Sequence, residues 1–257
     1  MPSLIERRKE IVRQAESEGR VNVEQLARQF QVSEVTIRND LNALSSRGLV
    51  VRSRGGAVAS TRLTRELSVQ EKYKENLAIK RKLGAAVVEL LGNDVRSILI
   101  DSGTTTEEVA RNLVERNDLT VMTNGLNIAS VLADADGIEI KVTGGTLRPK
   151  SMSFYGRQAE ESLKYMHFDR LILGVDGFDV SVGISTHFEQ EASLNRVMCD
   201  VASEIIAVTD STKFGKSGPH IICRYRDIKY LVTDTGAPAD AIDALRDAGV
   251  EVLLVDL

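Results

Sequence analysis

The chain has 257 residues, of which 42% are hydrophobic and 27% are charged, values typical of a globular protein with one or two domains. Aromatic residues make up only 4% and Trp is absent, which argues against a carbohydrate surface built from stacked rings. Cys199, Cys223 and the three histidines form neither a disulfide framework nor a metal-ligand spacing. We therefore expect no metal and no cofactor, and a reducing cytoplasm as the location.

Charge is unevenly distributed along the chain. Residues 1–60 carry 10 Lys or Arg against 7 Asp or Glu, a charge of +3, while the remainder carries 23 against 30, a charge of −7. A basic first part and an acidic second part suggest two domains, the first with an anionic partner. No apolar run approaches the length needed to span a membrane, so we expect no membrane partner.

The first part begins with three helical patterns. Residues 3–19 place apolar side chains on one stripe, and Gly19 ends the pattern. Residues 21–30 restart a helix at Asn22, and a third pattern follows over 34–48 after a three-residue turn. Two short helices joined by a tight turn predict a helix-turn-helix.

Polar side chains lie opposite the apolar stripe of the third helix. Asn and Arg can read adenine or guanine in the major groove, and hydroxyls can contact phosphates. Residues 48–58 then give two β-prone runs around a glycine turn, which predicts a basic wing. The alternative is a three-helix module that binds protein. The predicted DNA contacts are Ser33, Val35, Thr36, Arg38, Asn39, Asn42, Arg52 and Arg54.

The second part alternates strands and helices after a polar stretch. We interpret 1–58 as a winged helix-turn-helix domain, 59–75 as a linker with a partial helix, and 76–257 as an α/β domain. The predicted strands are 96–101, 119–123, 138–143, 170–175, 204–209, 229–234 and 250–255, and the predicted helices are 76–91, 105–116, 125–134, 157–166, 188–203 and 238–247. This alternation predicts a parallel sheet with helices on its faces.

Ligands of such sheets bind beyond the carboxyl ends of the strands, so the residues just after each strand are informative. Five predicted strands are followed by hydroxyl, amide, glycine or charged residues. The sequence "SGTTT" at 102–106 suits a phosphate, because its backbone is open and a helix N-terminus follows. It lacks the lysine of a Walker sequence, which favours a sugar phosphate over a nucleotide. Arg148 and Lys213 add positive charge, or belong to surface ion pairs.

The set of residues that we predict to bind this effector is therefore drawn from several strand ends. It comprises Asp101, Ser102, Gly103, Thr104, Thr105, Thr106, Thr123, Asn124, Gly144, Gly145, Arg148, Tyr155, Asp176, His187, Glu191 and Lys213.

The motifs resemble a known family. Residues 21–57, with "VSEVTIRNDL", "RGLV" and "RGGA", resemble the N-terminal domain of DeoR-type bacterial repressors. Asn39 departs from the second Arg or Lys of many members, which favours a base or water contact over a phosphate contact there.

The resemblance extends across about 76–255 through "DSGTTT", "TNGLNIA", "TGGTLR", "GVDGFD" and "TDSTKFGK", which resemble the sensor domain of the same repressors. That domain is similar in fold to ribose-phosphate isomerases and glucosamine-phosphate deaminases. "SFYG" and "STH" with "EA" most resemble repressors of N-acetylgalactosamine or related amino-sugar operons. The resemblance thus implies a Rossmann-like sensor. We expect a homodimer or homotetramer that places two recognition helices in successive major grooves of operator DNA.

An enzyme is the main alternative. Asp176–Asp179 reproduces the D-G-x-D of the isomerases, Glu191 is a candidate base and Lys213 a candidate cation. His187 is an acid/base candidate, a ligand partner or a helix-start residue. The lysine and glycine run that follows D-G-x-D in the isomerases is absent, because the chain reads "VSVGISTH". We therefore expect a site that binds without turnover, with no catalytic residue.

Overall fold

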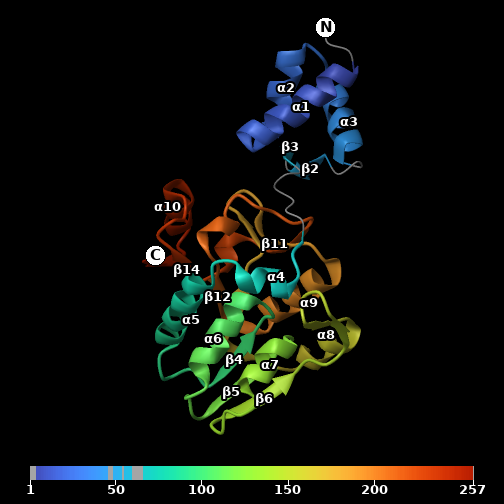
Figure 1. Cartoon of the computed structure of the whole chain (residues 1–257). Coiled ribbons are helices and arrows are strands. Elements are labelled where there is room, and N and C mark those ends of the chain that lie inside the picture. The colour runs from blue at the N-terminus through green and yellow to red at the C-terminus, as the bar shows by residue number, and fades with distance from the viewer. Residues whose placement is uncertain (1–3, 46–48, 54, 60–65, 257) are drawn as a thin grey trace. The chain divides into compact units, whose positions relative to one another are not determined.

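The computed structural model describes residues 4–45, 49–53, 55–59 and 66–256 (Figure 1). The chain divides into two compact units, Met1–Arg65 with Gly215–Pro219 and Glu66–Phe214 with His220–Leu257. Every helix within the described residues is too short or too polar to cross a membrane.

The first unit is a winged helix-turn-helix, as predicted. Its helices and strands in chain order are α1 Leu4–Glu18, β1 Arg20–Asn22, α2 Val23–Phe30, α3 Glu34–Ser45, β2 Val50–Ser53 and β3 Gly56–Ala59. The three strands pair antiparallel in the order β1-β3-β2. Gly56 is required where β3 meets β1, because a Cβ there would lie 1.9 Å from the carbonyl oxygen of Val21.

An ion-pair cluster ties α1 to α3. Asp40 is 1% exposed, and its carboxylate accepts from Nε of Arg7 at 2.6 Å and from Nε of Arg8 at 2.8 Å. The apolar stripe of α3, Ile37, Leu41 and Leu44, is buried on the same side of the helix. The opposite side of α3 is therefore left to face solvent.

The second unit contains the predicted parallel sheet. All seven predicted strands form, and they pair in parallel in the order β15-β14-β12-β9-β4-β5-β6. Their bounds are β4 Ser97–Ile100, β5 Leu119–Thr123, β6 Ile138–Val142, β9 Phe168–Gly174, β12 Ala202–Val208, β14 Tyr230–Asp234 and β15 Glu251–Val255.

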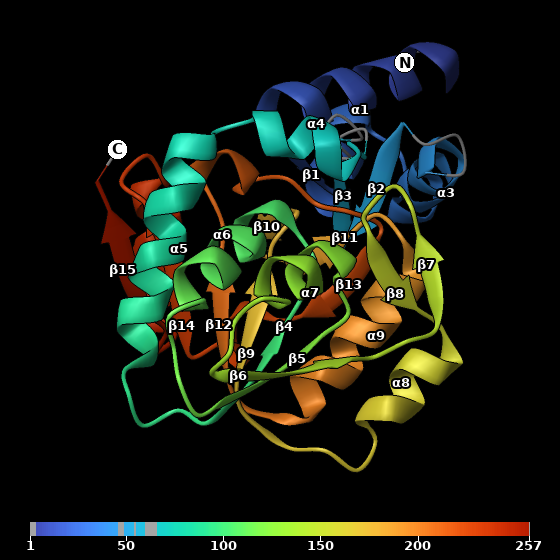
Figure 2. The ribbon, with the colours of Figure 1, turned by 60° about the horizontal axis from the view of Figure 1, so that its bottom comes forward.

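Two apolar cores cover the two faces of this sheet. Leu99 lies in one core, whereas Ile98 and Ile100 lie in the other, as the two-residue period of a strand requires. Helices α5, α6 and α7 lie one beside the next over one face, and α8, α9 and α10 pack against the other core (Figures 1 and 2). These helices are α5 Leu77–Leu91, α6 Thr104–Leu113, α7 Leu126–Leu132, α8 Arg157–Leu163, α9 Glu189–Asp200 and α10 Ala239–Asp247.

The partial helix predicted within 59–75 is α4 Val69–Lys74. Several other elements of this unit were not predicted. They are the strands β7 Thr146–Arg148, β8 Ser153–Tyr155, β10 Gly177–Asp179, β11 Gly183–Thr186 and β13 His220–Cys223, and the short 3-10 turns η2 Ser211–Lys213 and η3 Tyr225–Asp227. The predicted linker reached residue 75, whereas the second unit begins at Glu66. Helix α4 is held by a capping box in which Ser68 and Glu71 bond each other's backbone amides.

Candidate functional site

The exposed side of α3 carries the predicted DNA contacts. The Ser33 hydroxyl caps the helix by accepting from the amide of Thr36 at 3.1 Å, and the two hydroxyl oxygens lie 2.9 Å apart. Val35 is 62% exposed, and Asn39 and Asn42 are also exposed. A methyl-bearing side chain and two amides on one helix face match the chemistry of base edges in a major groove.

Two arginines flank this face. Arg38 is exposed and pairs with Glu34 one turn earlier at 2.7 Å. Arg52 is exposed on β2, and its Nη1 donates to the carbonyl oxygen of Gly56 at 2.8 Å across the hairpin. Arg54, the other predicted wing contact, lies outside the described residues. Neither described arginine is buried, so both guanidinium groups can exchange these partners for DNA.

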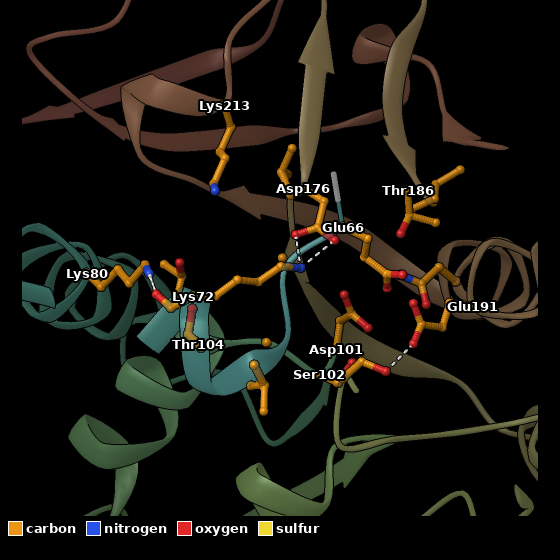
Figure 3. Close-up of a pocket in the computed structure, with 18 residues that line it drawn as sticks. Glu66, Lys72, Lys80, Asp101, Ser102, Thr104, Asp176, Thr186, Glu191 and Lys213 are labelled. Carbon is orange, nitrogen blue, oxygen red and sulfur yellow. Dashed lines mark hydrogen bonds and ion pairs between the residues drawn. The ribbon is translucent and has the colours of Figure 1, made fainter. Parts of the chain in front are cut away.

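The second unit contains a polar pocket at the carboxyl edge of the sheet (Figure 3). Its walls come from the ends of β4 and β9, from α5, α9 and η2, and from the segment that starts at Glu66. The lining residues are Glu66, Val69, Lys72, Lys80, Asp101, Ser102, Gly103, Thr104, Thr105, Ser151, Gly174, Val175, Asp176, Thr186, Glu191, Asn195, Lys213 and Ile222.

One end of the pocket is suited to an anion. Residues 102–105 of the predicted motif 102–106 line the pocket where α6 begins, and Gly103, which precedes the helix, adopts a φ of 151°, which side-chain-bearing residues rarely adopt. The helix therefore presents its first amides and the positive end of its dipole to the pocket. Lys213 also lines this cavity, with its Nζ 4.0 Å from Glu75.

Lys80 is the unusual cation of this end. Its side chain is 2% exposed, and its Nζ donates to the carbonyl oxygens of Lys72 at 2.5 Å and Glu75 at 2.6 Å. It forms no ion pair with any carboxylate of the described residues. Burial lowers the pKa of Lys80 to about 8, so most of it is still charged at neutral pH. The carboxylates of Asp210 and Glu75 stabilise this charge from beyond ion-pair distance, so the buried ammonium favours the binding of an anion.

The other end of the pocket is acidic. Asp101 is buried and accepts from Nδ2 of Asn124 at 3.3 Å, and burial together with the charge of Glu191 raises the pKa of Asp101 to about 8. Glu191 accepts from the hydroxyls of Ser151 and Ser153, the latter at 2.6 Å. Carboxyl and hydroxyl groups at this spacing can bind the hydroxyl or amino groups of a sugar.

Two cations from distant parts of the chain neutralise this end. Lys72 donates to both carboxylate oxygens of Asp176, at 2.6 and 2.7 Å (Figure 3). Burial opposes both charges, but the pair raises the pKa of Lys72 and lowers that of Asp176. Arg148 pairs with Glu66 through both terminal nitrogens, lies 3.3 Å from Glu191, and stacks 4.2 Å from the ring centre of Phe188.

The remaining predicted effector residues do not line the pocket. Thr106 and Thr123 are fully buried, and their hydroxyls donate to Gly103 and Ile100 carbonyl oxygens, which makes them part of the turns. Asn124 is also buried and accepts from the amide of Ser102 at 2.8 Å, so it positions the turn before α6.

The last predicted residues are half-buried and lie outside the lining of the pocket. Gly144 and Gly145 follow β6, and Tyr155 packs edge-on against Phe188. The half-buried His187 influences the pKa of Asp176 without lining the cavity. The end of β5 therefore supports the end of β4 through Thr123 and Asn124 but does not itself line the pocket.

Sequence reasoning missed Glu66, Lys72 and Lys80, along with the lining residues Ser151, Thr186 and Asn195. The charged residues of 66–82 do not recur with a helical period, so the sequence does not indicate which of them face a pocket. Only the position of Lys80 on the predicted helix 76–91 carried a signal, since it falls on the apolar stripe with Leu83 and Val87.

Two family models match the chain in sequence. A DeoR-like helix-turn-helix domain matches residues 7–62, and a DeoR C terminal sensor domain matches residues 75–235. A protein of Escherichia coli O157:H7 named as an aga operon transcriptional repressor is 49% identical over 97% of this chain and 93% of its own. The HTH-type transcriptional repressor GlcR of Bacillus subtilis is 32% identical over 93% of this chain and 91% of its own.

Solved structures give weaker matches. Ribose 5-phosphate isomerase A from Neisseria gonorrhoeae has a TM-score of 0.39 at 12% identity, covering 52% of each chain. The full-length sorbitol operon regulator SorC from Klebsiella pneumoniae has a TM-score of 0.40 at 14% identity, covering 93% of this chain and 98% of its own. Both scores are too low to bear on function.

Proposed function

The chain belongs to the DeoR family, and we propose that it represses a sugar or amino-sugar catabolic operon under the control of a phosphorylated sugar. The observation that carries this proposal is the pocket of the second unit, where a helix N-terminus meets Lys80 and Lys213. A phosphate binds at this end, and hydroxyl or amino groups of the sugar meet Asp101 and Glu191 at the other end. The predicted DNA contacts on α3 read the operator.

An amino sugar is the effector class that best suits this pocket. The E. coli relative named for the aga operon shares 49% identity, and "SFYG", "STH" and "EA" resemble repressors of N-acetylgalactosamine or related amino-sugar operons. The carboxyl groups of Asp101 and Glu191 can accept from an amide or an ammonium group as well as from hydroxyls. We therefore propose a hexosamine phosphate as effector.

The assembly on DNA is a homodimer or homotetramer. A helix-turn-helix repressor reads two half-sites with two recognition helices, which a dimer supplies. A regulator of operons works where the chromosome is, so we place this one in the bacterial cytoplasm. Coupling of about 1–3 kcal/mol between effector and operator changes the affinity for DNA roughly five- to 150-fold.

The alternative is a sugar-phosphate isomerase or deaminase attached to a DNA-binding unit. One observation favours it, namely that the candidate base Glu191 and the candidate cation Lys213 line the same pocket. Oε1 of Glu191 already accepts from two serine hydroxyls and from Arg148, however, so this oxygen is not free to take a proton from a substrate. We therefore favour binding over turnover.

The test starts from an operator selected out of random DNA by the purified full-length chain. Binding to that DNA is measured at two salt concentrations, with N-acetylgalactosamine 6-phosphate, galactosamine 6-phosphate, ribose 5-phosphate and the unphosphorylated sugars added in turn. We expect salt-sensitive binding that changes only with a phosphorylated sugar. Absence of selected DNA contradicts the repressor, and conversion of any sugar phosphate to product favours the enzyme.

A further inference from the structure

The guanidinium of Arg148 lies in an anion-binding site that is filled by the chain's own Glu66. Both terminal nitrogens of Arg148 donate to the Glu66 carboxylate, one of them at 2.8 Å, and Nζ of Lys150 lies 3.1 Å from it. The ring of Phe188 covers the guanidinium from one side. Burial opposes the charge of Glu66, yet the hydrogen bonds from Arg148 and Lys150 keep its pKa below its usual value. Glu66 is therefore bound as an anionic ligand would be.

Glu66 also separates this site from the effector pocket. Glu66 lines the pocket, whereas Arg148 does not, so the carboxylate lies where a ligand would reach the guanidinium. The same segment also contributes Lys72, whose Nζ lies in the pocket and donates to the carboxylate of Asp176. The amide of Val69 fixes the segment between them by donating to the carbonyl oxygen of Lys150 at 2.8 Å.

The place of Glu66 in the chain gives this contact a consequence. Glu66 is the first residue of the second unit, and the chain runs from the wing strand β3 to Glu66 through residues 60–65. Whatever binds or releases Glu66 thus acts on the segment by which the DNA-binding unit is covalently attached. A dianionic ligand in the pocket repels this carboxylate and offers Arg148 other oxygens.

We propose that Glu66 is an internal competitor of the effector, and that the effector takes the donors of Arg148 and releases Glu66, so that the segment leading to the DNA-binding unit is freed. The inference rests on the proposed effector pocket. The proposed signal starts when oxygens of the ligand replace the Glu66 carboxylate at the guanidinium of Arg148. Ligand and Glu66 then exclude each other, and release of Glu66 alone imitates part of the ligand's effect.

The test compares the full-length parent with Glu66→Gln, which removes the charge and keeps the size of the side chain. Glu161→Gln is the matched control, because it breaks an Arg–Glu pair of 2.7 Å on the exposed surface of α8. Affinity for N-acetylgalactosamine 6-phosphate and galactosamine 6-phosphate is measured by calorimetry, and operator affinity by fluorescence anisotropy. Hydrogen exchange of peptides covering 66–75 reports whether the segment is released.

We expect Glu66→Gln to bind the sugar phosphate about five- to thirtyfold more tightly, as the loss of a charged competitor for a half-buried arginine implies. Its operator affinity without ligand should lie between the free and the ligand-saturated values of the parent. Exchange over 66–75 should rise in the variant and, in the parent, on addition of ligand. Glu161→Gln should match the parent throughout.

Two results overturn the proposal and leave the proposed function standing. One is a parent that binds the sugar phosphate while Glu66→Gln binds it equally or more weakly. The other is ligand binding that leaves exchange over 66–75 unchanged. If the parent binds no sugar phosphate, the proposed function fails. The role of Glu66 is then still tested by hydrogen exchange and operator affinity in Glu66→Gln. If neither differs from the parent, the proposal for Glu66 is refuted.

Discussion

Replacing Lys80 by Met tests the phosphate-binding end of the pocket. Methionine keeps the length of the buried stem and removes the charge and the donors, so the packing beside Leu83 is retained. A charge-assisted hydrogen bond contributes about 1.5–3 kcal/mol, which predicts an effector affinity roughly ten- to 150-fold weaker. The low exposure of Lys80, 2%, places the expected loss toward the upper part of that range.

The substitution also removes the Lys80 donor from the carbonyl oxygens of Lys72 and Glu75, of which the Lys72 oxygen still accepts from the amide of Glu75 at 3.1 Å. An unsatisfied buried carbonyl costs about 1–3 kcal/mol, while removal of a desolvated ammonium offsets part of that loss. Thermal unfolding of Lys80→Met should therefore show a small decrease in stability. That measurement separates a damaged α4 from a lost phosphate contact.

The assay is calorimetric titration with the hexosamine phosphate that changes operator binding. Lys82→Met is the control, because Lys82 is an exposed lysine on the same helix whose Nζ donates to the carbonyl oxygen of Asp256 at 3.0 Å. It should bind the effector as the parent does. An Lys80→Met variant that is folded and binds within about twofold of the parent would refute the placement of the phosphate.

Three further predictions follow from the two sites. Arg38→Ala should weaken operator binding by about 1–3 kcal/mol, because it removes a proposed contact to a base. The fold should be unaffected, since Arg38 is exposed and its only ion pair among the described residues is with Glu34. Unchanged operator affinity at two salt concentrations contradicts the docking of α3 in the major groove. Thr105→Glu should abolish the effector response and spare DNA binding, since a carboxylate at the start of α6 repels a phosphate; normal release from the operator places the phosphate elsewhere. Effector affinity should rise with pH near pH 6, where the phosphate loses its second proton. It should fall above about pH 8, where Lys80 loses its positive charge and Asp101 gains a negative charge. An effector affinity that stays constant to pH 9 argues against a role for both groups.

The fold could be predicted because its signals are local. Each strand of the large sheet is a short apolar run, and each following helix has its own apolar stripe, so the parallel arrangement follows without knowledge of distant contacts. The small strands at 177–179 and 183–186 were missed because their sequence is rich in glycine and serine and has no apolar run. They form a separate three-stranded sheet with β13, a partner from far along the chain.

The pocket was only partly predictable, because neighbouring residues of one type have different roles. Thr105 lines the pocket, whereas Thr106 is buried and bonds the carbonyl oxygen of Gly103. One step along a helix rotates the side chain by about 100°, so the motif "TTT" alone cannot separate them. The hydroxyl of Thr123 likewise makes its hydrogen bonds within the protein, because it donates to the carbonyl oxygen of Ile100 at the end of β4 and accepts from the amide of Gly125 after β5.

The residues that complete the pocket come from the segment that sequence alone favours as a linker. Glu66 meets Arg148 from 82 positions away and Lys72 meets Asp176 from 104 positions away, and such pairs leave no periodic trace. A ligand that competes with or depends on Glu66, Lys72 and Lys80 changes the free energy of that segment. By linkage, anything that holds the segment changes the ligand's affinity by the same factor. If the effector binds in this pocket as proposed, its binding is coupled to the chain that leads into the DNA-binding unit without any contact between effector and DNA.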